Sequence, residues 1–117
     1  MTIYNINNLR GDTYDGAKFT LSRLGEPPLT LIGAFIIVQF KVNSKSPPLL
    51  TWIIGEGITL DLVDPLVFYF DPCIFSLAAG AYKYDVEITY ADGRVSTDIN
   101  GTLTLTDDIS QRNGGVK

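Results

Sequence analysis

The chain has 117 residues, with 9 basic and 13 acidic side chains and therefore a formal net charge of −4. This length fits one domain with one core, and the 45% of hydrophobic residues is typical of a globular protein. The acidic balance argues against nucleic acid as a partner, because binding phosphates requires a basic surface.

The histidine and cysteine content excludes several kinds of site. There is no histidine and one cysteine, Cys73, so an internal disulfide, a Cys/His zinc site and Ser-His or Cys-His catalysis are all excluded. Because Pro72 and Ile74 flank Cys73 in an apolar stretch, we expect a buried, inert thiol. The sequence predicts a protein that is not an enzyme and carries no cofactor.

The two ends of the chain are polar. Residues 1–10 predict an N-terminal arm, of which residues 2–6 could form a short edge strand. Residues 1–12 are too polar for a signal peptide. No apolar run approaches the roughly 20 residues of a membrane helix, so we expect no membrane partner and synthesis in a cytoplasm without classical export. Residues 107–117 predict a flexible tail, which leaves a single domain over residues 1–106.

The first half of the chain alternates between apolar and polar residues, which is typical of strands. Strands are predicted at residues 17–21, at 30–42 and at 49–54, with Pro27 and Pro28 ending the first. In the second strand the even positions from Ile32 to Val42 form one continuous apolar face.

The second half contains further strands at residues 58–62 and 66–70, and then a long hairpin over residues 80–106. Residues 71–79 predict a loop or one helical turn. Asp92-Gly93 between two alternating runs predicts a two-residue type I′ turn. That turn would place Tyr90 opposite Val95 and every apolar pair on one side of the sheet, including Ile88–Thr97, Val86–Ile99, Tyr84–Gly101 and Tyr82–Leu103. About seven or eight antiparallel strands of this kind predict an all-β protein with a β-sandwich fold.

Two groups of residues could carry a ligand site, and each has a simpler explanation. Asp61, Asp64 and Asp71 could bind calcium, but each begins or ends a strand, where turn chemistry also favours aspartate. Tyr82, Tyr84 and Tyr90 could form a sugar platform, but their spacing of two residues alongside Val86 and Ile88 favours the core.

Several strands are apolar on both faces, whereas a sandwich needs only one apolar face per strand. The second faces would be covered either by loops of the same chain or by another subunit, and the sequence leaves both open. The residues concerned are Phe35, Ile37, Leu49, Ile53, Val67 and Tyr69.

Two stretches of sequence carry a resemblance to a known family. The first half contains Phe19-Thr20-Leu21, Gly25-Glu26-Pro27, Leu31-Ile32-Gly33-Ala34 and Gln39-Phe40-Lys41. The second half contains Gly80-Ala81-Tyr82-Lys83-Tyr84-Asp85-Val86, Asp92-Gly93-Arg94-Val95-Ser96-Thr97, Gly101 and Asp107-Asp108-Ile109-Ser110. Together these phrases resemble the immunoglobulin-like modules of tailed-bacteriophage structural proteins, and they are similar to the N-terminal domain of siphophage baseplate upper proteins.

The resemblance implies an immunoglobulin-like sandwich in a virion protein of the tail, baseplate or fibre. It implies a virion location after synthesis in the host cytoplasm, with other virion proteins as partners and a homo-oligomer such as a trimer or hexamer. Because no receptor-binding head follows the module in this sequence, we expect an adaptor or connector. The alternative is a carbohydrate-binding or adhesin-like module on the virion. The expected contact residues are Phe35, Ile37, Trp52, Ile53 and Tyr69.

Overall fold

The computed structural model describes residues 2–21 and 30–107, and the regular structure in these ranges consists of strands, which confirms the all-β prediction. None of the described residues belongs to a helix long and apolar enough to cross a membrane. The strands are β1 (Thr2–Ile3), β2 (Ile6–Leu9), β3 (Thr13–Tyr14), β4 (Ala17–Thr20), β5 (Phe35–Lys41), β6 (Leu50–Ile54), β7 (Gly57–Leu60), β8 (Val67–Phe70), β9 (Cys73–Ile74), β10 (Gly80–Thr89) and β11 (Val95–Thr106).

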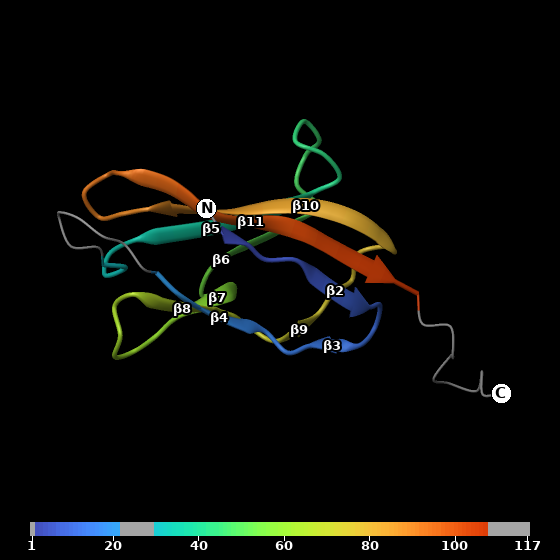
Figure 1. Ribbon diagram of the computed structural model, residues 1–117, viewed down its shortest axis with the longest axis horizontal. Helices are drawn as coiled ribbons and strands as arrows, with labels where there is room; N and C mark the ends of the chain where they lie inside the picture. The colour runs from blue at the N-terminus through green and yellow to red at the C-terminus, as the bar shows by residue number, and fades with distance from the viewer. Residues whose placement is uncertain (1, 22–29, 108–117) are drawn as a thin grey trace.

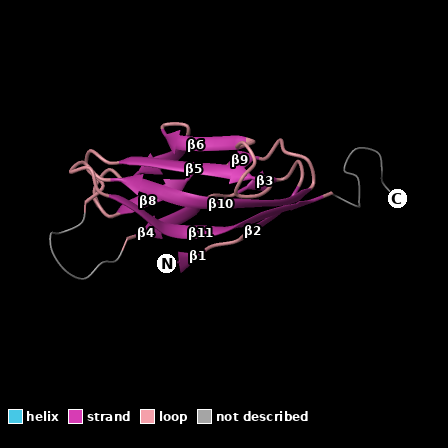
Figure 2. Ribbon diagram, turned by 90° about the horizontal axis from the view of Figure 1, so that it is seen from above, coloured by secondary structure: helices cyan, strands magenta, loops and turns pink. Residues whose placement is uncertain are grey.

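The strands form two layers that face each other. The main sheet has the order β1-β11-β10-β5-β6-β7-β8-β4, with β2 also paired to β11 and with β3 paired to β9 apart from it. The sheet turns back on itself after β6, so that β6, β5, β10 and β11 make one layer and β7, β8 and β4 lie in the other (Figure 1). Figure 2 shows β6, β5, β10 and β11 lying side by side in that order.

This arrangement is the predicted immunoglobulin-like sandwich. The hydroxyl of Tyr82, near the start of β10, donates to the backbone oxygen of Ala78 over 2.6 Å, as in the tyrosine corner of immunoglobulin-like folds. Not all pairs are antiparallel as predicted, because β1 and β2 run parallel to β11 and two residues of β6 run parallel to β7. The parallel pairs arise where the N-terminal residues line the free edge of β11 and where the chain crosses between layers.

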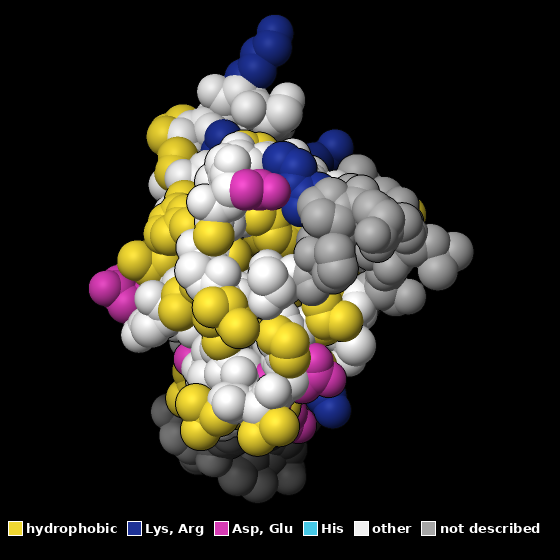
Figure 3. Space-filling view, turned by 90° about the vertical axis from the view of Figure 1, so that its left-hand side faces the viewer, with side chains coloured by type: hydrophobic (Ala, Val, Ile, Leu, Met, Phe, Trp, Pro, Cys, Tyr) yellow, Lys and Arg dark blue, Asp and Glu magenta, His cyan; other side chains and the backbone are white. Residues whose placement is uncertain are grey.

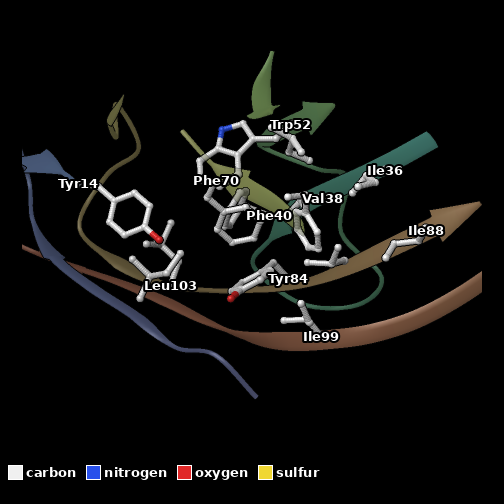
Figure 4. Packing of buried hydrophobic residues seen from close by; sticks show 14 of the residues in the cluster. Tyr14, Ile36, Val38, Phe40, Trp52, Phe70, Tyr84, Ile88, Ile99 and Leu103 are labelled. Atoms are coloured by element: carbon white, nitrogen blue, oxygen red, sulfur yellow. The ribbon is translucent and has the colours of Figure 1, made fainter. Parts of the chain in front are cut away.

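Aromatic rings from both layers fill the core (Figure 4). Phe40 of β5 lies 4.8 Å from the ring centre of Trp52 and 5.1 Å from that of Tyr84, and Trp52 lies 5.1 Å from Phe70 of the opposite layer. Tyr82, Tyr84 and Tyr90 are all buried, which confirms the core interpretation of the tyrosine spacing over a sugar platform.

The β10–β11 hairpin differs from its predicted register near the turn. The amide of Gly93 donates to Tyr90, and the amide of Tyr90 donates to Arg94, so the loop has three residues instead of two. Gly93 adopts a φ of 95°, as expected after a type I turn in a loop of this length. The extra residue is compensated by a bulge at Asp98, beyond which Val86–Ile99, Tyr84–Gly101 and Tyr82–Leu103 pair as predicted. Between the turn and the bulge, the side chains of β11 point to the opposite sides of the sheet from those predicted. Val95 therefore points outward, with 59% of its surface exposed.

The N-terminal residues are part of the sheet. Thr2 pairs with Ile99, Ile6 pairs with Leu103, and the amide of Tyr4 donates to the oxygen of Asn100 over 2.9 Å. Of the two interpretations of residues 2–6, the edge strand is found at residues 2–3 and again at residues 6–9, because the long β11 offers unpaired backbone groups along its free edge. Apart from Asp107, the predicted tail lies outside the described residues.

Residues 71–79 hold no helical turn, since they include the short strand β9, whose Cys73 pairs with Tyr14. Cys73 is half-buried instead of fully buried, and this partial burial raises the pKa of its thiol.

Candidate interaction surface

The side of the β6-β5-β10-β11 layer that points away from β4, β7 and β8 is an exposed surface, here called the outer face. Alternation along each strand places every second side chain on it. These residues are Leu49, Thr51 and Ile53 by β6, Phe35, Ile37, Gln39 and Lys41 on β5, Lys83, Asp85, Glu87 and Thr89 on β10, and Val95, Thr97, Asn100 and Thr102 on β11.

One half of the outer face is apolar. Phe35 pairs with Thr89, and Thr89 pairs with Val95, so these three side chains form a row across three strands. Phe35 is 47% exposed and Val95 is 59% exposed. In the next row Ile37 lies directly opposite Ile53, and both are half-buried. An aromatic ring and three aliphatic side chains are therefore neighbours on one exposed sheet surface.

The other half of the outer face is polar and slightly hollowed. Lys41 and Lys83 lie directly opposite each other, and neither forms an ion pair with a described residue. A hollow of about 230 Å³ is lined by Gln39, Lys41, Asn43, Ser44, Lys83, Tyr84, Asp85 and Asn100. Like charges directly opposite each other destabilise a sheet, so an acidic group above the two lysines would relieve their repulsion.

Residues 43–48, between β5 and β6, rise above the outer face at its polar end (Figure 1). Their conformation is held by local hydrogen bonds: the side-chain oxygen of Asn43 accepts from the amide of Lys45 over 2.9 Å, and the Ser46 hydroxyl donates to the backbone oxygen of Asn43 over 2.8 Å. The loop is thus a fixed ridge beside the hollow.

Only three of the five contact residues predicted from the sequence share a surface. Phe35, Ile37 and Ile53 lie together on the outer face. The prediction that Trp52 is a contact residue is wrong. Trp52 is 6% exposed and its ring packs in the core, because its position in β6 faces inward. Tyr69 lies on β8 in the opposite layer, so it cannot belong to the same surface. Val95 was missed, since the two-residue turn would have pointed it inward.

Tyr69 belongs to a polar cluster on the layer formed by β7, β8 and β4. Its hydroxyl donates to Asp61 over 2.6 Å, and the other carboxylate oxygen of Asp61 accepts from the amides of Val63 and Asp64. These hydrogen bonds, led by that from the Asp64 amide, lower the pKa of Asp61 to about 2. The bond to Asp61 also raises the pKa of Tyr69.

The carboxylates of Asp61, Asp64 and Asp71, considered above as possible calcium ligands, all accept hydrogen bonds within the chain. The carboxylates of Asp61 and Asp64 accept hydrogen bonds from the backbone of their own turn, and Asp71 accepts from the Thr59 hydroxyl over 2.6 Å. Within residues 2–21 and 30–107, no group of three or more Asp, Glu, Cys or His side chains could hold a metal ion. The turn chemistry of aspartate accounts for Asp61 and Asp64, and the hydrogen bond from Thr59 of β7 engages Asp71.

The end of the sandwich that carries the β10–β11 turn is also apolar. Ile32 is 72% exposed, and Leu62 and Val63 in the β7–β8 loop are 99% and 90% exposed. Figure 3, which looks onto this end, shows hydrophobic side chains interspersed with basic and acidic ones. Phe35 and Val95 lie at the same end of their strands, so the apolar half of the outer face borders this region.

Comparisons with known proteins find similarity among solved structures. No family model matches the chain, and no curated protein matches it. The chain is similar to the crystal structure of CopC from Methylosinus trichosporium OB3b, with 12% sequence identity, a TM-score of 0.45 and 89% of each chain covered.

These comparisons contradict the predicted role as a bacteriophage virion structural protein. No family model and no curated protein supports that role, and the similar structure named above is CopC. The prediction is wrong as stated, and we abandon it together with its alternative of a carbohydrate-binding module on the virion. The sequence motifs that carried the resemblance lie mainly at turn and core positions. Such positions specify a fold but not a function.

Proposed function

We propose that the chain is a non-enzymatic binding module that associates with a second copy of itself through the outer face. The observation that carries the proposal is the exposed cluster of Phe35, Ile37, Ile53 and Val95 on one flat sheet surface. Burying such side chains contributes about 25 cal/mol for each Å² of apolar surface removed from water.

A second copy is supported by the charge of the surface. The outer face carries Lys41 and Lys83 together with Asp85 and Glu87, so it has equal numbers of positive and negative side chains. A partner of strongly positive or negative charge would leave one sign unmatched, whereas the same surface on a second copy supplies both. Closed two-fold contacts between identical surfaces are also the commonest form of protein oligomer.

The size of the surface is also compatible with a dimer. Four strands spaced about 4.8 Å apart and seven residues of about 3.3 Å each span about 440 Å² before side-chain relief is counted. A stable interface buries about 800 Å² on each partner. The sheet surface alone is smaller than this, so the ridge of residues 43–48 and the bordering apolar end would have to add to the contact. One such surface favours a two-fold dimer over the expected trimer or hexamer.

The test is the molar mass in solution by light scattering on a sizing column, over concentrations from about 1 to 500 μM, a range that covers weak and tight association. We expect a dimer for the native protein and a monomer for the Phe35→Asp and Val95→Asp variants. Ile74→Asp is the matched control, because Ile74 is an aliphatic residue with 60% exposure on β9, far from the outer face in the fold.

A native protein that is monomeric across the whole range overturns the proposal. So does a dimer that Ile74→Asp disrupts while Phe35→Asp leaves it intact, because the contact would then involve a different surface. Far-ultraviolet circular dichroism on each variant confirms that the fold is retained.

A further inference from the structure

The charges and shape of the outer face define how two copies would face each other. We propose that the two-fold axis of the dimer runs across the strands, so that Lys83 of each copy meets Glu87 of the second copy. This inference rests on the proposed self-association and adds its orientation.

The charges along β10 distinguish two arrangements. Lys83, Asp85 and Glu87 follow one another on the outer face, and Lys41 lies beside Lys83 on β5. An axis parallel to the strands would place Lys41 of one copy over Lys83 of the second, which sets like charges against each other. An axis across the strands reverses the strand direction and centres the contact on the row of Asp85, so that Asp85 meets its own copy once, at the axis. Glu87 of one copy then lies over Lys83 of the second, and this contact occurs twice.

The aliphatic residues by β6 favour the same arrangement. Leu49 is 51% exposed at the polar end of the outer face, opposite Lys41, while Ile53 lies four residues further along. With the axis across the strands, Leu49 of one copy meets Ile53 of the second. With the axis along the strands, Leu49 would instead lie over Thr102 of β11, a polar neighbour.

The ridge of residues 43–48 gives a third reason. It rises at the Lys41 end of the layer, where β5 ends (Figure 1). Reversal of the strand direction brings this ridge of one copy onto the Phe35 end of β5 in the second, where exposed Pro47 and Pro48 would cover Phe35. The ridge of each copy would then contact the second copy, so that ridge contacts lie at both ends of the interface. These contacts add buried area to that of the sheet surface.

The test uses two charge-reversal variants, Lys83→Glu and Glu87→Lys. Each variant alone places like charges together twice in its own dimer, so we expect each to weaken self-association at least tenfold, or about 1.4 kcal/mol. Mixed in equal amounts, they restore both attractive contacts, so we expect a heterodimer with a mass and affinity close to those of the native dimer. Both side chains are exposed, so the fold should tolerate the changes.

The outcomes separate this inference from the proposed function. If Phe35→Asp abolishes the native dimer but the mixture of charge variants associates no better than either variant alone, the orientation is overturned and the self-association remains. If the native protein is monomeric, both proposals fail. As a control, Thr51→Glu mixed with Glu87→Lys should give no rescue, because Thr51 lies on β6 away from Glu87 of the second copy.

Discussion

The backbone oxygen of Tyr4 occupies the space that a side chain at Gly101 would need. A Cβ atom built on Gly101 would overlap this oxygen and would lie 3.1 Å from the ring of Tyr84, whose hydroxyl donates to the same oxygen. The glycine therefore lets the N-terminal strand dip toward the core between β1 and β2. The expectation that Tyr84 covers Gly101 is correct, but the glycine is needed mainly because the backbone of Tyr4 approaches it.

Gly101→Ala should destabilise the protein by about 1–3 kcal/mol, because the backbone of the N-terminal strand must move to admit the methyl group. Urea unfolding monitored by circular dichroism measures the change. Gly93→Ala is the control: its Cβ would meet nothing within 4 Å, so it should cost only the strain of positive φ, about 1 kcal/mol. Equal effects of the two changes would contradict the role given to Tyr4.

Tyr84→Phe should cost about 1–2 kcal/mol, because it removes the donor to the Tyr4 oxygen while leaving that oxygen enclosed. Burial raises the pKa of the Tyr84 hydroxyl well above its ordinary value, so the native bond persists to strongly alkaline pH. Amide hydrogen exchange gives the specific readout: the amide of Tyr4, bonded to Asn100, should exchange faster in the variant, while amides in β8 should not.

Trp52→Ala should destabilise the protein by about 3–5 kcal/mol, since it leaves a cavity between Phe40, Phe70 and Phe75. Trp52→Phe should remain folded and keep the oligomeric mass of the native protein. A Trp52→Phe variant that is folded but monomeric would show that the indole takes part in association after all, against its buried position in the core.

Asp61 should contribute to stability in a pH-dependent way. Its pKa in the folded protein is about 2, below the ordinary 3.8, so its contribution is fully present above about pH 4 and is lost as the pH falls toward 2. Asp61→Asn should lower Tm at neutral pH, and the difference from the native protein should shrink between pH 4 and pH 2. Glu56→Gln, at an exposed carboxylate, serves as control. A difference that stays constant with pH would contradict the assignment.

The sequence by itself determined the all-β class, most of the core and the positions of the longer strands, because alternation reports directly which side chains leave water. It did not predict β3 or β9, and the strand expected over residues 30–42 begins at Phe35, with Ile32 exposed. It also excluded every site that needs histidine or a pair of cysteines. The structure decided what depends on residues distant in the sequence. The three-residue turn and the bulge at Asp98 turned Val95 outward, and the free edge of β11 bound residues 2–9. The sequence also could not tell which of the exposed apolar residues share a surface. Phe35, Ile37 and Ile53 lie on one layer and Tyr69 lies on the other. Alternation distinguishes the two sides of a strand, but it does not say to which layer the strand belongs.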